Sequence, residues 1–279
     1  MELAQAQHFP LLLHTILTDK CIERGLPANA GGACIYNGPA VAFTGGWGTV
    51  ADSLAAVKKL VYEEKKISMA DLVKMIDANF EGYENYRQIL IHDIPKYGND
   101  DDYVDELARD IFQFASNEVR KYTGVFGNRN MPATDVSVSY IIFGKSVWAS
   151  PDGRKAGEAF SDNISPTDQR DKEGPIAHIN SVTKLGLEKQ FGSIHNIYLT
   201  NVEGEDKKHK IIDLIDAYHI RGGHHLQINC IDKQTLLNAQ RHPENYPTLM
   251  VRVAGYVAYF VDLSKTVQDY IIRRTSVKL

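Results

Sequence analysis

The feature that most limits the fold of this chain is an apolar segment near its C-terminus that contains a single glycine, Gly255. The segment reads Val251-Arg252-Val253-Ala254-Gly255-Tyr256 and continues as Val257-Ala258-Tyr259-Phe260-Val261. β-Branched and aromatic residues at this density are typical of β-strands. A lone glycine weakens a strand and usually marks a bend or a close approach between two backbones. The sequence therefore predicts an extended segment that bends at Gly255.

Length and composition place the chain among ordinary globular proteins. It has 279 residues, of which 43% are hydrophobic and 24% are charged. A net charge of −4 gives no reason to expect nucleic acid or an anionic membrane as a partner. We see no apolar run of membrane-spanning length and no basic region of a signal peptide. The three cysteines form no CxxC pair, which fits a reducing compartment, so we expect a cytoplasmic protein.

The hydrophobic periodicity predicts helices that alternate with strands. Helices are expected over 11–24, from Asp52 to Val61, from a capping box at Ser68–Asp71, from Asp102 to Tyr122, over 176–184, over 210–218, after Asp232 and over 264–273. Strands are expected over 136–143, 225–231 and 250–260, and an ordered loop over 156–186. This alternation favours an α/β fold. We expect a single domain over 1–279, with the glycine segment and the last helix in 249–279.

Three other motifs allow two interpretations each. Gly45-Gly46-Trp47-Gly48 before a helix could bind a phosphate, but it lacks the P-loop ending, which favours a structural turn. His224 and His225 could bind a metal, but adjacent strand residues point to opposite faces, so we expect no metal site. The acidic run 100–106 lacks the glycine of a calcium loop and is more typical of a helix N-terminus.

The segment from Arg252 to Tyr256, with the aromatic residues and the helix that follow, resembles the signature of glycyl radical enzymes. This resemblance implies that Gly255 stores an organic radical, with Arg252, Val253, Ala254 and Tyr256 forming the radical-loop motif. A radical on Cα is delocalised over both flanking amide groups only when Cα becomes planar, and glycine has no side chain to oppose this. We expect the apolar flanks Val253, Val257 and Phe260 to protect the radical from water and oxygen.

Four further segments resemble the dehydratase-type, pyruvate formate-lyase-like branch of that family, in the same order along the chain. They are Gly31-Gly32-Ala33 with Tyr36-Asn37, Lys96 to Asp101, Ser150 to Glu158, and Gly222-Gly223 with Gln227 and Asn229. The resemblance implies a ten-stranded α/β barrel with surrounding helices, of which this chain is the C-terminal half. Gln227, Asn229, Ser137 and Ser139 are candidate substrate-binding residues.

The chain departs from the family in one respect that bears on activity. Family members carry a catalytic cysteine in a Gly-Cys-Val/Ile-Glu loop, and no such string occurs here. Cys34 lies where the family usually has arginine, and for Cys21, Cys34 and Cys230 we expect the role of small buried hydrophobic residues. Three interpretations follow: a radical-bearing subunit of a split enzyme, a spare-part domain that restores an oxygen-damaged enzyme, or a radical-free scaffold. The retained barrel motifs favour the first.

The resemblance also implies an oxygen-sensitive, anaerobic activity and its partners. A separate radical-SAM activating enzyme with an iron–sulfur cluster would install the radical, and no cofactor would be bound to the chain itself. A partner chain would supply the cysteine loop, and together they would catalyse a radical elimination, of the dehydratase or C–X lyase type, on a small molecule. Decarboxylation and acyl transfer are the alternatives within the family.

Overall fold

The chain forms two compact units in the computed structural model, whose described residues are 2–33, 40–43, 45–127, 129–134, 138–200, 202–253, 256–274 and 277–278. The first unit comprises Met1–Phe43, Gln113–Ala133 and Lys189–Phe191. The second comprises Thr44–Phe112, Thr134–Glu188 and Gly192–Leu279. Compact units need not fold independently, so the single domain expected over 1–279 stays a prediction.

The first unit begins with short helices: α1 (Glu2–His8), α2 (Leu12–Leu17), α3 (Cys21–Arg24) and the 3₁₀ turn η1 (Ala28–Ala30). Its strand β1 (Ala40–Phe43) pairs with β2 (Met131–Thr134). The single helix expected over 11–24 is wrong, because the chain breaks between α2 and α3, where Lys20 has a φ of 67°. The end at Gly25 is confirmed, since Gly25 caps α3 in the left-handed region. Helix α2 has no buried residue.

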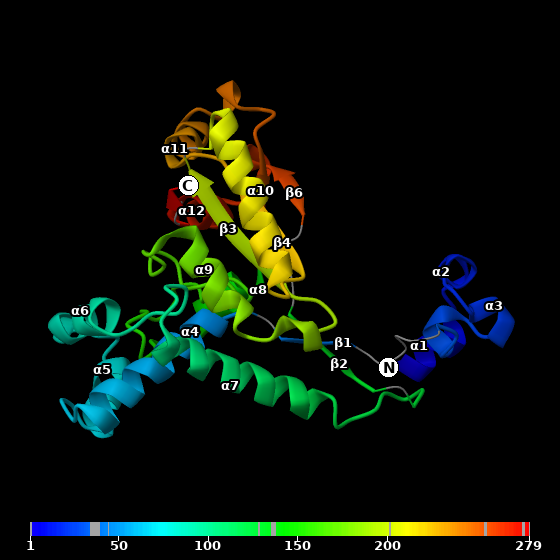
Figure 1. Ribbon diagram of the computed structural model, residues 1–279, viewed down its shortest axis with the longest axis horizontal. Coiled ribbons are helices and arrows are strands. Elements are labelled where there is room, and N and C mark those ends of the chain that lie inside the picture. Colours follow the sequence, from blue (N-terminus) through cyan, green and yellow to red (C-terminus); the bar gives the residue numbers. More distant parts are fainter. Residues whose placement is uncertain are drawn as a thin grey trace. The chain divides into compact units, whose positions relative to one another are not determined.

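The second unit holds most of the regular structure (Figure 1). Its helices are α4 (Trp47–Ala56) with the π-helix η2 (Val57–Glu63), α5 (Met69–Asp77), α6 (Glu84–His92), most of α7 (Asp102–Val119), α8 (Ser139–Ser146), α9 (Gly174–Thr183), α10 (Glu205–Ile220), α11 (Lys233–Arg241) and α12 (Lys265–Arg273), with 3₁₀ turns η3 (Leu187–Lys189, which ends in the first unit), η4 (Pro243–Asn245) and η5 (Phe260–Asp262). Its strands are β3 (Ile194–Thr200), β4 (His225–Asn229), β5 (Met250–Arg252), β6 (Val257–Tyr259) and β7 (Val277–Lys278).

The parallel pair β3–β4 organises this unit, with α10 as the connection between the two strands. Strand β7 pairs with the other edge of β3, giving the order β4-β3-β7. Residues paired in register share a face of the sheet. One face therefore presents Asn196 with Gln227 and Tyr198 with Asn229, and the other presents Ile197 with Ile228.

The apolar face of the sheet is covered by helices. Ile197 and Leu199 of β3 are fully buried in one cluster with Leu214 and Tyr218 of α10. The same cluster extends to residues of α4, α5, α7 and α9. The helical layer on this face leaves the polar face of β3 and β4 for the site described below.

Several local predictions are confirmed. Ser68 and Asp71 form a complete capping box at the start of α5. Helix α7 begins at Asp102, as expected. At the start of α11, Asp232 accepts a hydrogen bond from the Thr235 amide. Helix α12 ends at Arg273. Gly153 donates to the Ser150 carbonyl in the expected turn.

Other predictions are wrong. The strand expected over 136–143 is helix α8 wherever the structure describes it, from residue 138 onward. Its buried residues are Tyr140, Ile141 and Gly144, which is helical spacing, and a Cβ at Gly144 would lie 2.4 Å from the Glu158 carbonyl oxygen. Helix α4 starts at Trp47 rather than Asp52, and Cys230 is exposed. Cys21 is buried as expected, and Cys34 lies outside the described residues.

Within the described ranges, no helix combines the length and the apolar character that crossing a membrane requires.

The helix–sheet packing leads to a stability prediction. Leu214→Ala should lower the free energy of unfolding by about 2–5 kcal/mol, because it leaves a cavity between α10 and the sheet. Ile212→Ala lies on the same helix, but Ile212 is 53% exposed, so its cost should be below about 1 kcal/mol. Urea unfolding of the two variants, followed by circular dichroism, checks this. Equal losses would contradict the packing described for α10.

Candidate active site: a glycine hairpin on a polar sheet face

The glycine segment forms an antiparallel hairpin. Strands β5 and β6 pair with Val251 opposite Ala258 and Arg252 opposite Val257, and the Val253 amide donates to the Tyr256 carbonyl over 3.0 Å. Ala254 and Gly255 connect these two residues in the sequence and lie outside the described residues. The predicted extended segment is confirmed on both sides of Gly255.

The side chains of the hairpin differ in exposure. Val251 and Val253 are 2% and 1% exposed and pack with Phe260 against α11 and α12. Tyr256 and Val257 are each 50% exposed. Val253 and Phe260 are thus buried as a protective flank requires, whereas Val257 is not.

A side chain from the sheet anchors the hairpin. The Arg252 amide donates to Oδ1 of Asn229 at the end of β4 over 3.3 Å. Asn229 lies beside Tyr198 on the polar face, and Gln227 lies one step earlier on the same face, where it is 2% exposed. The structure therefore brings Gln227 and Asn229 to the side of the sheet that holds the hairpin. Their role in binding substrate stays a prediction.

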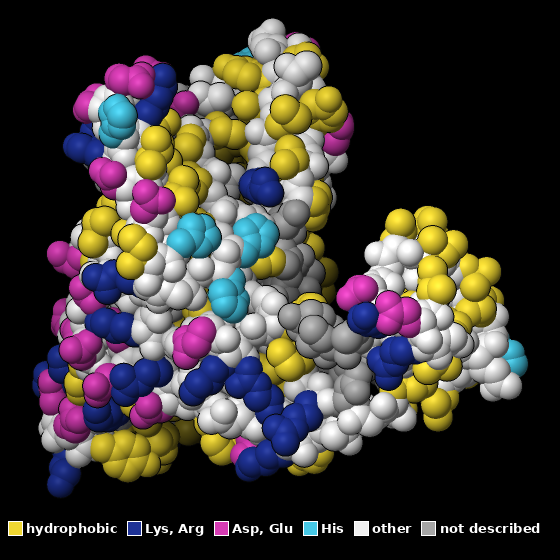
Figure 2. Space-filling view, turned by 45° about the vertical axis from the view of Figure 1, so that its right-hand side comes forward, with side chains coloured by type: hydrophobic (Ala, Val, Ile, Leu, Met, Phe, Trp, Pro, Cys, Tyr) yellow, Lys and Arg dark blue, Asp and Glu magenta, His cyan; other side chains and the backbone are white. Residues whose placement is uncertain are grey.

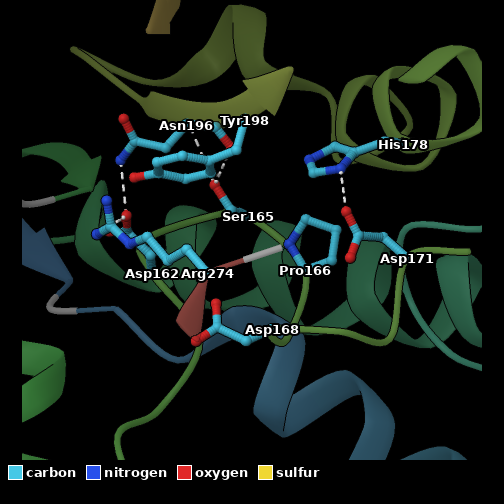
Figure 3. Close-up of a pocket in the computed structure, with 9 residues that line it drawn as sticks. All are labelled: Asp162, Ser165, Pro166, Asp168, Asp171, His178, Asn196, Tyr198 and Arg274. Atoms are coloured by element: carbon cyan, nitrogen blue, oxygen red, sulfur yellow. Dashed lines mark hydrogen bonds and ion pairs between the residues drawn. The ribbon is translucent and has the colours of Figure 1, made fainter. Parts of the chain in front are cut away.

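A buried charged cluster lies on the same polar face (Figure 3). Arg274, directly after α12, forms an ion pair with Asp162 over 2.8 Å, and neither side chain is more than 4% exposed. Asp162 also accepts from Nδ2 of Asn196 on β3 over 2.7 Å. Burial raises the pKa of Asp162, and the neighbouring guanidinium opposes that shift.

Asp168 is a second carboxyl group at this cluster. Burial raises its pKa to about 6, against the opposing effect of Arg274 and Arg273. The Tyr270 hydroxyl lies 3.5 Å from its Oδ1, and the Arg273 guanidinium lies 3.9 Å from its Oδ2. Asp168 is therefore a group that can gain or lose a proton near neutral pH.

A histidine–carboxylate pair lies at the other end of the same cavity (Figure 3). Nδ1 of His178 on α9 is 2.9 Å from Oδ2 of Asp171, and both side chains are less than 10% exposed. The His178 ring stacks on His195 of β3 with centroids 4.7 Å apart. Burial lowers the pKa of His195 well below its ordinary value, so His195 is neutral. The cavity between the Arg274–Asp162 pair and His178 is about 20 Å³, which is room for one water molecule and not for a substrate.

The other two candidate substrate-binding residues, Ser137 and Ser139, stay predictions. Ser139 is the first residue of helix α8, and Ser137 lies outside the described residues. Sequence reasoning did not identify Asp162, Asn196, Tyr198 or Arg274. The available signals were the charged residues within the ordered loop 156–186 and the Arg273-Arg274 pair at a helix end.

The glycine cluster 45–48 has a packing role. A Cβ at Gly48 would lie 2.9 Å from the Ser165 carbonyl oxygen, and the Gly46 amide donates to the Ser161 carbonyl. The amides of Trp47 and Thr49 in the first turn of α4 are bonded as well, to the Asn163 carbonyl and the Ser161 hydroxyl, and so are not available to a phosphate. In the described part of the chain, no three His, Cys, Asp or Glu side chains are arranged to hold a metal ion.

Comparison with known proteins identifies the family. Residues 1–144 match the family model for pyruvate formate lyase-like proteins, and residues 160–261 match the glycine radical model. The chain is 41% identical over 272 residues to trans-4-hydroxy-L-proline dehydratase of Clostridioides difficile, covering 97% of this chain and 34% of that protein. It is 43% identical over 235 residues to isethionate sulfite-lyase of Nitratidesulfovibrio vulgaris, covering 82% of this chain and 28% of that protein.

Solved structures agree. The hydroxyproline dehydratase of C. difficile superposes with a TM-score of 0.93 at 40% identity, over 100% of this chain and 35% of that one. The B12-independent glycerol dehydratase of Clostridium butyricum gives 0.92 at 37% identity, over the same share of each chain. This α/β chain belongs to the glycyl radical enzyme family. It spans about a third of the length of these relatives.

The raised pKa of Asp168 leads to a pH prediction. The folded state favours the protonated acid, so the contribution of this group to stability is full below pH 3.8 and is lost as the pH rises through about 6. Asp168→Asn removes this loss. Relative to the natural protein, the variant should gain up to about 3 kcal/mol of unfolding free energy between pH 4 and pH 7, since one pKa unit corresponds to about 1.4 kcal/mol.

Urea titrations across that pH range measure the difference. Ile212→Ala, which removes no titratable group, is the control and should keep a constant offset from the natural protein. A constant offset for Asp168→Asn as well would contradict the assignment of a raised pKa to this carboxyl group.

Proposed function

We propose that Gly255 carries a stored radical and that this chain is the radical-bearing subunit of a split glycyl radical enzyme. A partner chain supplies the cysteine loop, and a separate radical-SAM enzyme with an iron–sulfur cluster activates Gly255. Membership of the family supports the class of chemistry. The observation that carries the proposal is the hairpin on both sides of Ala254 and Gly255, anchored to Asn229 on the polar face of β3 and β4.

The proposed reaction moves hydrogen atoms and conserves the radical. The activating enzyme takes one hydrogen atom, a proton with its electron, from Cα of Gly255. Gly255 then recovers a hydrogen atom from the partner's cysteine thiol, which leaves a thiyl radical. The thiyl takes a hydrogen atom from a substrate carbon, and the substrate radical loses its neighbouring leaving group with a proton. The thiol returns its hydrogen atom to the product radical, so the net reaction is an elimination.

The relatives support elimination on a small molecule. Their names describe a dehydratase, which breaks a C–O bond, and a sulfite-lyase, which breaks a C–S bond. We therefore propose dehydration or C–X lysis for this chain. The amide groups of Gln227 and Asn229 suit a substrate that carries hydroxyl or carboxylate groups.

Two alternatives remain within the family. The chain could be a spare-part radical domain without its own catalytic activity, which restores an oxygen-damaged enzyme. It could also belong to a decarboxylase or acyltransferase, and indoleacetate decarboxylase of Tractidigestivibacter scatoligenes is 34% identical over 292 residues. The polar sheet face favours the first proposal over a spare part, because a loop-replacing domain would not need that face.

The first test addresses the radical. Anaerobic activation should give an EPR doublet split by the one hydrogen that remains on Cα of Gly255. Gly255→Ala should abolish the signal, because the added methyl group opposes a planar Cα. Gly192→Ala is the control, since a Cβ there meets no atom within 4 Å, and it should keep the signal. An EPR doublet that persists in Gly255→Ala would refute the assignment.

The second test addresses assembly. Four apolar side chains of α2, namely Leu12, Leu13, Ile16 and Leu17, are 65–77% exposed, and the hairpin exposes Met250, Tyr256, Val257 and Tyr259 by 47–57%. Figure 2 shows hydrophobic side chains over much of the surface of α1 to α3 and at the end of the second unit that holds β5 and β6. Apolar surface on this scale marks an interface with another protein.

We therefore expect the native chain to purify with a cysteine-loop protein. Leu13→Gln with Leu17→Gln should release that protein and make the isolated chain more soluble, whereas Lys208→Gln on α10 should not. Size-exclusion chromatography with mass identification measures both effects. A well-behaved monomer that turns over substrate alone would contradict the split-enzyme proposal. Restoration of an air-cleaved full-length enzyme would support the spare-part alternative instead.

A further inference from the structure

The guanidinium of Arg274 contacts the glycine hairpin formed by β5 and β6 directly. Both Nη atoms of Arg274 donate to the carbonyl oxygen of Val253 over 3.3 Å, two residues before Gly255 in the sequence. Arg274 is 5% exposed, and the contact joins the end of α12 to the start of the loop. Arg274 itself lies beyond residues 160–261, which match the glycine radical family model.

The other contacts of Arg274 fix the guanidinium to the sheet. Nη2 pairs with Oδ2 of Asp162 over 2.8 Å and donates to the Tyr140 hydroxyl. Asp162 in turn accepts from Asn196 of β3. A continuous path of hydrogen bonds therefore runs from β3 through Asp162 and Arg274 to the Val253 carbonyl.

Aromatic rings enclose the guanidinium. Its carbon lies 4.6 Å from the ring centroid of Tyr270, 4.8 Å from that of Tyr198 and 5.7 Å from that of Tyr140. A planar guanidinium can stack on rings while its N–H groups bond in the plane, which a lysine ammonium cannot do. The rings also exclude water, which strengthens the ion pair and the bond to the carbonyl.

We propose that Arg274 is a positioning residue for the glycine hairpin. It holds the Val253 carbonyl, as Asn229 holds the Arg252 amide, and these two anchors together fix the strand that leads to Gly255 on the polar face of the sheet. The functional meaning of this position rests on the proposal that Gly255 carries the radical. The anchoring itself does not.

Hydrogen exchange on the unactivated protein tests the anchoring without any radical. In Arg274→Gln, amides in the peptide 249–260 should exchange on the order of tenfold faster, because the hairpin loses a charge-assisted hydrogen bond. Asp162→Asn should have the same effect. Amides of α10 (Glu205–Ile220) report the remainder of the fold and should not change.

The matched control is Arg273→Gln. Arg273 is the preceding residue, 43% exposed, and its ion pair with Asp168 does not involve the hairpin. This variant should leave exchange in 249–260 unchanged. Unchanged exchange there in Arg274→Gln would overturn the proposal. If Arg274→Gln also accelerates α10, Tyr140→Phe replaces it: a smaller, hairpin-confined increase supports the proposal, and no increase overturns it.

A second readout separates this proposal from the proposed function. In activated protein, Arg274→Gln should shorten the lifetime of the EPR doublet in air several-fold relative to Arg273→Gln, which a purely structural role would not do selectively. If exchange responds as expected but no radical forms in the natural protein, the anchoring stands and the proposed function fails. If the radical forms and both its lifetime and the exchange ignore Arg274, the anchoring fails and the proposed function stands.

Discussion

The parallel pairing of β3 with β4 is the constraint on which the rest of the second unit depends. The register places Asn196 beside Gln227 and Ile197 beside Ile228, so one face of the pair is polar and the other is apolar. A shift by one residue would turn the amides toward the helices and the isoleucines toward the hairpin. The packing of α10 under one face therefore also determines which side chains face the glycine hairpin on the other.

The ion pair on the polar face is better explained by geometry than by stability. Burying Arg274 and Asp162 costs desolvation that their attraction does not fully offset, and apolar replacements of buried pairs are often as stable. Arginine stays charged at any physiological pH, so Asp162 must compensate it within the fold. What such a pair does provide is direction: while Nη2 pairs with Asp162, both Nη atoms reach the carbonyl of Val253, two residues before Gly255.

Sequence patterns predicted the elements whose signals are local. The capping box at Ser68, the cap at Asp232 and the glycine stop at Gly25 act within four residues, and all three are present. The strand prediction over 136–143 failed because β-branched residues there suit a strand, whereas the side that packs inward, Tyr140, Ile141 and Gly144, has helical spacing. Strand β3 was missed because its residues alternate between polar and apolar only from Asn196 onward, whereas Ile194 and His195 at its start reverse that pattern.

At the candidate site, too, local signals could be read from the sequence and long-range contacts could not. Gly255 is recognisable because the chemistry proposed for it demands one residue type within a fixed string. Arg274 and Asp162 are 112 residues apart, and only the folded chain shows that they meet. Nothing in the composition of the loop 156–186 distinguishes Asp162 from its neighbours. The role of its carboxylate depends on the contacts with Asn196 on one side and the Arg274 guanidinium on the other.

The uneven exposure of the hairpin side chains bears on the proposed radical chemistry. Its inner face is closed by Val251, Val253 and Phe260, and its inner edge is held by Asn229 and Arg274. Its outer side chains, Tyr256 and Val257, are half exposed. A backbone radical survives only where water and oxygen are excluded on both sides. The described residues thus close one side of the strands that flank Gly255, and the proposed radical would need further cover over Tyr256 and Val257.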